Sequence, residues 1–367
     1  MTDNELIAIL RLQRIPNIGD INAKKLIQRC GNALAIFESK KEHLLKIEGI
    51  GTATLKGLYD TIYLEEAQAE LRFIKDNDIA FDYYQDNTYP KHLKHCIDGP
   101  ILLFKTGAIE LNSRRIISVV GTRNITSYGQ SFCDTFIEEI APLDPIIVSG
   151  FAYGVDIAIQ KAAMENGLQT IGCLAHGLNQ IYPKTHKKYM NKVERNGGFY
   201  TEFWSTSNPD RENFLKRNRI IAGMSEATLV VESAEKGGSL VTADIANSYN
   251  RDVFAVPGRS SDKFSVGCNN LIKQQKAQMI TSAAELVYLL GWQLEEKTKP
   301  AVQKQLFIEL DDTEKVIYTY LNSKGKQLLD TVALECKLPI YKVSSTLLNM
   351  EMKGVVRPLP GKLFEVI

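Results

Sequence analysis

The sequence predicts an α/β protein, in which an extended Rossmann-like parallel sheet follows an N-terminal helical domain and precedes a C-terminal winged helix. Between residues 113 and 290, short apolar runs alternate with helical patterns of about 10 to 15 residues, which is typical of a parallel sheet covered on both faces. The residues before 80 read as short helices, and those after 309 as three helices and a hairpin. These patterns predict domains at 1–80, 81–292 and 309–367.

The composition is that of a soluble globular protein too long for one ordinary core. Of the 367 residues, 44% are hydrophobic and 24% are charged, and the net charge is +1, so any affinity for nucleic acid requires local clusters of Lys and Arg. No stretch approaches the ~18 apolar residues of a membrane span, and the N-terminus lacks a signal-peptide core. The six cysteines form no CxxC pair, which argues against a zinc site. We therefore expect a cytoplasmic protein without a metal site.

Two stretches of the N-terminal region look alike, IPNIGDINAKKLI (15–27) and IEGIGTATLKGL (47–58). Each has an apolar residue, a tight turn with glycine and a helix expected just after, which is the pattern of a helix-hairpin-helix or SAM-like domain. A plain helical bundle that uses Gly19 and Gly51 for its turns explains the same pattern. From 81 to 112 we expect an extended segment and one strand.

The apolar runs of the central region are the predicted strands. They are RRIISVVG (114–121), PIIVSG (145–150), QTIGCLA (169–175), GFYTE (198–202), ATLVVES (227–233), RDVFAVPG (251–258) and AQMI (277–280). Most end in Gly, Ser or Pro, so loops gather at the carboxyl edge of the sheet, where open α/β sheets bind their ligands.

The loop after the first of these strands, VVGTRNITSYGQ (119–130), predicts a phosphate site. Gly121 permits a sharp turn, Ser127 can cap the next helix, and Arg123 adds a permanent charge. The GxGxxG spacing of a dinucleotide site is absent, so no nicotinamide cofactor is expected. In the next loop Asp156 is expected to cap a helix or orient Arg123. We expect His176 and His186 to be structural, because no candidate nucleophile accompanies them.

The strongest local signal is the segment NFLKRNRIIAGMSEATLVVESAEKGGSLVTA (213–243). Lys216, Arg217 and Arg219 crowd into one turn beside Phe214 and Asn218, which suits a phosphate backbone and a stacked base. Lys216 and Arg219 are spaced i,i+3 and so can face one groove. A solvated helix face is the alternative. Further on, Gly237 and Gly238 with Ser239 and Thr242 predict an anion-binding nest.

The C-terminal region predicts a winged helix whose third helix carries only Lys342 and Lys353, which favours protein contact over DNA reading. The charged stretch 293–305 reads as a linker. The apolar stretch 269–290, interpreted as helical, is the candidate surface for dimerisation and for a recombinase.

Together these motifs resemble the DNA processing protein A family (DprA, also called Smf), over almost the whole length. The resemblance depends on VGTR (120–123), SGFAYGVD (149–156), YPKTH (182–186), FLKRNRIIAGMS (214–225), KGGSLVTA (236–243) and VPG followed by GCNNLI (256–272). It implies a homodimer that binds single-stranded DNA, protects incoming DNA in natural transformation and loads the RecA recombinase, with no catalysis of its own. The first loop has GTR where many relatives have GSR, and YPKTH ends in His where Asn is common.

The resemblance also implies which residues bind DNA. They are Gly121, Thr122, Arg123, Lys184, Phe214, Lys216, Arg217, Asn218, Arg219, Gly238, Ser239 and Leu240. The enzyme alternative is a phosphoribohydrolase-like enzyme on a similar scaffold, for which Asp244 is the candidate acid. A transcription regulator that uses the winged helix is the third possibility.

Overall fold

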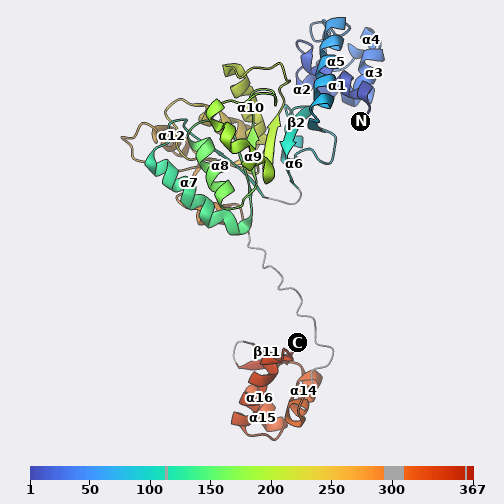
Figure 1. The fold of residues 1–367 in the computed structure, drawn as a ribbon. Helices are drawn as coiled ribbons and strands as arrows, with labels where there is room; N and C mark the ends of the chain where they lie inside the picture. Colours follow the sequence, from blue (N-terminus) through green and yellow to red (C-terminus); the bar gives the residue numbers. More distant parts are fainter. Residues whose placement is uncertain (112–114, 293–309, 360–361) are drawn as a thin grey trace. The chain divides into compact units, whose positions relative to one another are not determined.

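The computed structural model describes residues 1–111, 115–292, 310–359 and 362–367 and divides into two compact units, Met1–Leu294 and Glu295–Ile367 (Figure 1). The N-terminal helices and the large sheet belong to the first unit, and the winged helix belongs to the second. The predicted linker at 293–305 lies outside the described residues. Among the described residues, no helix is both long enough and apolar enough to cross a bilayer.

The N-terminal region is a small helical layer. Its helices are α1 (Asp3–Arg14), α2 (Asp20–Cys30), α3 (Ala33–Glu38), α4 (Lys41–Leu44) and α5 (Thr61–Asp76). Fully buried Ile9, Leu10 and Leu12 form the inner face of α1, which packs along α5 (Figure 1). The stretch 47–58 forms successive turns rather than the expected helix, and Gly57 within it has a φ of +82°. The prediction of a helix in the second of the two similar stretches, 47–58, is therefore wrong.

A nine-stranded sheet forms the centre of the first unit. Its order is β1-β2-β6-β5-β4-β3-β7-β8-β9. The seven strands β3 to β9 are parallel to one another, whereas β2 pairs antiparallel with β6 and β1 pairs antiparallel with β2. The strands are β1 (Ala80–Tyr83), β2 (Leu102–Gly107), β3 (Ile116–Val120), β4 (Ile146–Ser149), β5 (Thr170–Cys173), β6 (Gly197–Thr201), β7 (Ala227–Val230), β8 (Asp252–Ala255) and β9 (Gln278–Met279). All seven predicted strands form. The connector 81–112 contributes two strands, one more than expected, with the short α6 (Lys91–Lys94) between them.

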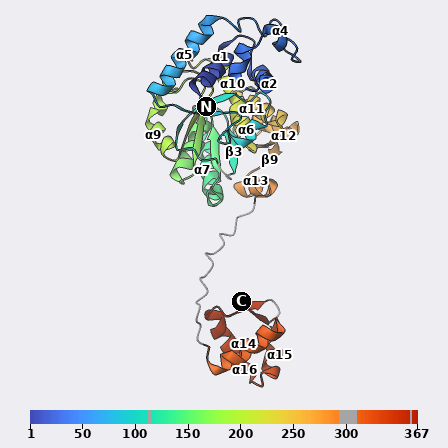
Figure 2. The same cartoon turned by 90° about the vertical axis from the view of Figure 1, so that its right-hand side faces the viewer.

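Helices cover both faces of the sheet, because alternate strand residues point to opposite sides. On one face Ile117 and Val119 of β3 pack with α7 (Ser127–Ile140) and α8 (Val155–Glu165). On the other, Ile116 and Val120 pack with α10 (Arg211–Met224) and α11 (Gly238–Ser248). These two helices lie side by side (Figure 2). A third cluster lies under α9 (Lys187–Arg195), which follows the short 3₁₀ turn Lys184–His186.

The stretch 269–290 is not one helix. It contains the end of α12 (Val266–Lys273), the edge strand β9 and α13 (Ala283–Leu289). Because Gln275 adopts a φ of +56° between α12 and β9, the chain turns there instead of continuing as a helix. The prediction of a continuous apolar helix is therefore wrong.

The second unit has the three helices and the hairpin that the sequence predicts. They are α14 (Asp312–Lys324), α15 (Leu329–Glu335), α16 (Ile340–Met352), β11 (Val356–Leu359) and β12 (Leu363–Val366), with the additional short strand β10 (Gln327–Leu328) beside β12. A capping box between Asp311 and Glu314 begins α14, and Leu321 and Leu347 are buried in the core. The α/β class with a C-terminal winged helix is thereby confirmed.

Candidate functional site

A cleft of ≈ 1020 Å³ lies at the carboxyl edge of the parallel sheet. Three segments meet there: the loop after β3, the N-terminal half of α10, and the loop between β7 and α11. The cleft is lined by Gly121, Thr122, Arg123, Phe214, Arg217, Asn218, Gly238 and Ser239 of the predicted site residues. Arg123 and the 214–219 segment therefore share one groove.

Helical periodicity explains which side chains of α10 reach the cleft. The lining residues Arg211, Phe214, Asn218 and Ile221 recur every three or four positions, and so lie on one face of the helix. Asp210 caps the helix by accepting a hydrogen bond from the Asn213 amide at 3.0 Å. This face is presented to the cleft because the opposite side of the helix packs against the sheet and α6.

The loop after β3 is held by backbone contacts. The amide of Thr122 donates to the Glu232 carbonyl at 2.7 Å, and the Thr122 carbonyl accepts from the Val155 amide at 3.0 Å. Gly154 allows this approach, since its φ is +76° and a Cβ there would lie 2.1 Å from the Thr122 oxygen. Thr126, rather than the predicted Ser127, caps α7 and also donates to Glu232 at 2.5 Å.

An exposed cation and two aromatic rings form the mouth of the cleft. The guanidinium carbon of Arg123 lies 5.2 Å from the centroid of Phe214, whose ring lies 5.5 Å from that of Tyr182. Among the described residues, no carboxylate forms an ion pair with Arg123. The arginine is therefore kept in place by a ring and by its loop, and its charge is available to an anion.

Three further cations line the cleft, and sequence reasoning missed them as site residues. They are Arg211, Lys236 and Lys263, all exposed and, within the described part of the chain, without a carboxylate in ion-pair contact. Arg211 lies one turn before Phe214, and Lys236 directly precedes Gly237 of the predicted nest. Arg211 and Lys236 could have been found from the sequence, because each lies close to a motif already assigned to the site. Nothing in the sequence pattern connects Lys263 with the cleft.

Arg217 forms part of the floor of the cleft rather than its mouth. It is 4% exposed, and its Nη1 donates to the carbonyl of Gly150 at 2.7 Å and to that of Cys173. Asp156 is the opposing charge. Its Oδ2 accepts from the amide of Gly150 at 3.1 Å, and burial raises the pKa of this carboxyl while Arg217 opposes the shift. The expectation that Asp156 orients Arg123 is therefore wrong.

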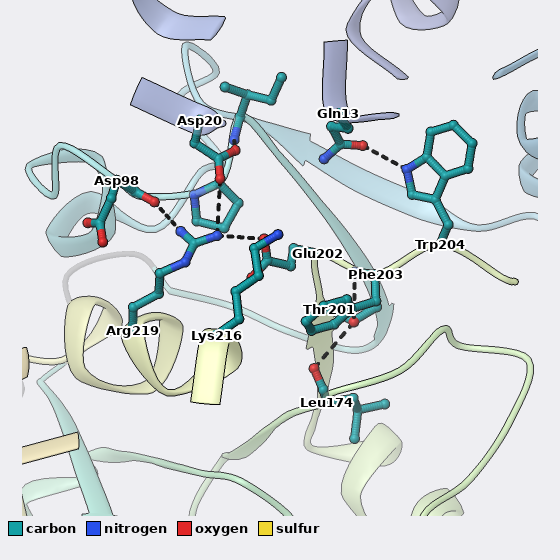
Figure 3. A network of polar contacts seen from close by, with 12 residues as sticks. Gln13, Asp20, Asp98, Leu174, Thr201, Glu202, Phe203, Trp204, Lys216 and Arg219 are labelled. Carbon is teal, nitrogen blue, oxygen red and sulfur yellow. Dashed lines mark hydrogen bonds and ion pairs between the residues drawn. The ribbon is translucent and has the colours of Figure 1, made fainter. Parts of the chain in front are cut away.

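Lys216 and Arg219 point away from the cleft. They share one side of α10, as their i,i+3 spacing predicts, but that side faces Glu202, which is 6% exposed (Figure 3). Arg219 donates to Glu202 at 2.5 Å, to Asp20 of α2 at 3.1 Å and to the Asp98 carbonyl, and Lys216 lies 3.1 Å from Glu202. The expectation that both cations face the groove is not met, because both pair with Glu202, which follows β6, and Arg219 also pairs with Asp20 of α2.

The residues predicted to form an anion nest lie at the start of α11. The exposed Gly237 and Gly238 begin the helix, and the hydroxyl of Ser239 donates to that of Ser233 at 2.9 Å. The Asn218 amide group donates to the Gly238 carbonyl at 3.3 Å, which connects the nest to α10. Leu240, by contrast, packs against the core, and Lys184 lies on the 3₁₀ turn outside the cleft.

Neither histidine singled out in the sequence lines the cleft. His176 and His186 are buried, and Nδ1 of each donates to a backbone carbonyl, of Gly177 at 2.8 Å and of Phe151 at 3.0 Å. Burial lowers the pKa of both rings. Asp244, the candidate acid of the enzyme alternative, forms an ion pair with Lys276 at 2.9 Å and also lies outside the cleft.

The sequence matches two protein families. The family "DNA recombination-mediator protein A" matches residues 80–291, and "DprA winged helix domain" matches residues 302–362. Among curated relatives, "Protein Smf" of Escherichia coli (strain K12) is 34% identical over 278 residues, which are 74% of each chain. "DNA processing protein DprA" of Bacillus subtilis is 39% identical over 199 residues, which cover 54% of this chain and 67% of the relative.

Two solved structures are also similar. The crystal structure of DNA processing protein A from Streptococcus pneumoniae has a TM-score of 0.68 at 28% identity, and the match covers 78% of this chain and 98% of that one. That of Helicobacter pylori, described for its single-stranded DNA binding mode, has a TM-score of 0.52 at 28% identity, covering 57% and 95%. The resemblance read from the sequence motifs is confirmed, and the chain belongs to the DNA recombination-mediator protein A family, also called DprA or Smf.

Proposed function

We propose that this chain binds single-stranded DNA in the cleft at the carboxyl edge of its sheet. The observation that carries the proposal is the mouth of the cleft, where Arg123 lies against Phe214 and Tyr182 without a carboxylate partner among the described residues. A cation beside aromatic rings suits a strand that offers a phosphate and an unstacked base together. The single-stranded DNA binding described for the Helicobacter pylori relative supports the same function.

The charges of the cleft suit a phosphate backbone. Four exposed cations line it, Arg123, Arg211, Lys236 and Lys263, and the start of α11 adds backbone amides at the nest. If each cation neutralises one phosphate, the logarithm of affinity falls with that of salt with a slope of about −2.8. Affinity then decreases roughly fiftyfold between about 50 and 200 mM salt. None of these groups reads base edges, so binding is expected to be independent of sequence.

Paired bases are expected to bind less well than unpaired ones. A base in a duplex is stacked on its neighbours and cannot turn onto Phe214 or Tyr182 without loss of pairing. We therefore expect preference for single strands over a duplex of equal length.

The cellular role that we propose is DNA processing in natural transformation and recombination. In this role the chain acts as a homodimer, protects the incoming strand and loads the RecA recombinase onto it. The names of the relatives support DNA processing, and the match to DNA recombination-mediator protein A supports a role in recombination. Addition of purified RecA to the preformed complex tests the loading step. Faster filament growth than on naked DNA is expected, and an unchanged rate contradicts it.

Fluorescence anisotropy tests the binding site. Labelled oligo-dT and a duplex of the same length are titrated across salt with the unchanged chain, with Arg123→Ala and with Arg72→Ala. Arg72 is an exposed arginine of α5 outside the cleft, so it controls for net charge. We expect Arg123→Ala to weaken single-strand binding and reduce the salt slope by about 0.7, with little effect of Arg72→Ala. Equal affinity of both variants, or better binding of duplex, contradicts the proposal.

The same preparation tests the enzyme alternative. Release of a free base from a nucleoside monophosphate would support a phosphoribohydrolase, and its loss in Asp244→Asn would identify the acid. DNA binding without base release contradicts this alternative.

A further inference from the structure

A second, smaller pocket lies beside the cleft. Its volume is ≈ 270 Å³, and it is lined by Ile125, Gln130, Gly154, Ile157, Ala158, Lys161, Thr185, His186, Lys188 and Tyr189. The function proposed above does not use this pocket, and none of its residues is among the predicted site residues.

Two segments contribute neighbouring residues to both pockets. The loop after β3 gives Asn124 to the cleft and the next residue, Ile125, to the second pocket. The start of α8 gives Asp156 to the cleft and Ile157 to the second pocket. Consecutive Cα atoms are only about 3.8 Å apart, so the two sites are neighbours on one surface.

An exposed aromatic residue, Tyr153, lies in the chain between Ala152 of the cleft and Gly154 of the second pocket. Tyr153 is 44% exposed and immediately precedes Gly154 of the second pocket. The hydroxyl of Thr185 donates to its phenol oxygen at 3.3 Å, and its ring lies edge-on to His186 with 5.1 Å between centroids. Both contacts join Tyr153 to the wall of the second pocket, which leaves its exposed part available to a base that crosses between the sites.

The second pocket combines cations with an aromatic ring and contains no carboxylate in its lining. The ammonium of Lys188 lies 5.0 Å from the centroid of Tyr189, and that of Lys161 lies 6.0 Å from it. Among the described residues neither lysine forms an ion pair. Lys188 lies in the first turn of α9, where the helix dipole repels a cation. This turn has no acidic residue that would offset the repulsion. An anion bound here would relieve that repulsion.

The other side of the cleft is less suited to a phosphate. A third pocket of ≈ 900 Å³ shares Lys263 and Phe264 with the cleft and adds Arg259. Its lining also contains the carboxylates of Glu232 and Asp262, whereas the lining of the second pocket contains none. Of these two pockets beside the cleft, the one at Tyr189 has the more favourable electrostatics for a phosphate.

We propose that the second pocket binds the flanking nucleotide of the strand held in the cleft. Lys161 and Lys188 contact its phosphate, and the ring of Tyr189 supports its base. This inference rests on the proposed single-strand binding and assigns the direction in which the strand continues, past Tyr153 and over the start of α8 and α9. A strand that only fills the cleft does not reach these residues.

The dependence of affinity on oligonucleotide length tests the proposal. Labelled oligo-dT from about four to about sixteen nucleotides is titrated by anisotropy. We expect the variant Lys161→Ala/Lys188→Ala to bind the shortest strands that the unchanged chain binds with unaltered affinity, and the longer ones about tenfold more weakly, with the salt slope reduced by about 1.4. Tyr189→Ala should also weaken only the longer strands, and Tyr189→Phe should retain binding, because the ring is kept.

The matched control is Lys192→Ala/Arg195→Ala, which removes the same charge from the last turn of the same helix, outside the pocket. An equal loss with this control, a loss that does not depend on length, or no loss at any length overturns the inference. In each of these cases the proposed function stands as long as Arg123→Ala still weakens the short strands. Absence of any single-strand binding by the unchanged chain would instead refute the proposed function.

Discussion

Arg219 is expected to stabilise the fold rather than to bind DNA, and Arg219→Ala tests this. Its side chain is 10% exposed and donates to Glu202 at 2.5 Å, to Asp20 at 3.1 Å and to the Asp98 carbonyl. Burial alone would lower the pKa of Arg219, but the three acids Glu202, Asp20 and Asp98 together raise it. The cation is therefore strongly attracted to its site, and its loss leaves Glu202 buried with one partner fewer.

The size of the effect follows from the burial of Glu202. Removing one partner of a buried ion pair costs about 3 to 5 kcal/mol, because the remaining charge stays out of water. Lys216 remains 3.1 Å from Glu202 and is 55% exposed, so it compensates in part. We expect Arg219→Ala to lower the free energy of unfolding by about 3 kcal/mol, and Lys216→Ala by less than about 1 kcal/mol.

Tryptophan fluorescence in urea measures this loss in the first unit alone. Both tryptophans of the chain, Trp204 and Trp292, lie in that unit. Trp204 also donates to Gln13 of α1 at 2.9 Å, so its signal reports the contact between the helical layer and the sheet (Figure 3). If Arg219→Ala leaves the free energy of unfolding unchanged and weakens binding of oligo-dT, Arg219 binds DNA and does not stabilise the fold.

Three further results are expected. Burial lowers the pKa of His176 and His186, so these residues bind protons more readily in the unfolded chain as pH falls below about 6.5. The free energy of unfolding in urea should therefore decrease below this pH, and it should decrease less in the variant His176→Gln/His186→Gln. Gly154→Ala should weaken oligo-dT binding in anisotropy, because its Cβ would meet the Thr122 carbonyl and displace the loop after β3 that holds Arg123. Lys342→Glu should leave that affinity unchanged, and a clear loss would identify the winged helix as a second DNA site.

The sheet could be predicted from the sequence because its strands are buried on both faces. Such strands read as apolar runs, and the runs at 114–121 and 227–233 became β3 and β7. The strand β1 was missed as a strand because Ala80–Tyr83 is only half buried and its segment contains Asp82. Asp82 is compatible with a strand here because Lys105 and Tyr200 both donate to it, and these contacts appear only in the folded chain.

The sequence predicted where the candidate site lies better than it predicted which residues line it. Loops at the ends of parallel strands meet at one edge whatever their sequence, so the grouping of Arg123 with Phe214 follows from topology. The fate of Lys216 and Arg219 depends instead on Glu202 and Asp20, which lie on other elements. Glu202 lies nine residues before α10 and Asp20 lies at the start of α2, so the pattern of α10 itself does not show which acids its cations will meet.

The arrangement of α10 explains how one basic segment can perform two tasks. A rotation of about 100° per residue separates Phe214 and Asn218, which face the cleft, from Lys216 and Arg219, which face Glu202. Arg219 also pairs with Asp20 and so joins α10 to the helical layer. Between them Arg217 crosses below the cleft and joins the ends of β4 and β5 through the carbonyls of Gly150 and Cys173. The helix is thus fixed at three points before any ligand arrives.

A fixed floor matters for a site that binds any sequence. When no base edge is read, affinity depends on phosphates and rings, and each contact is worth more if the protein need not be ordered at the moment of binding. We therefore expect the buried cations Arg217 and Arg219 to contribute to affinity by holding Phe214 and Asn218 in place. The exposed cations Arg123 and Arg211 are expected to supply the salt-dependent part. Substitution of Arg217 or Arg219 should lower the free energy of unfolding and leave the salt slope of binding unaltered. Substitution of Arg123 or Arg211 should reduce the salt slope and leave the free energy of unfolding unaltered.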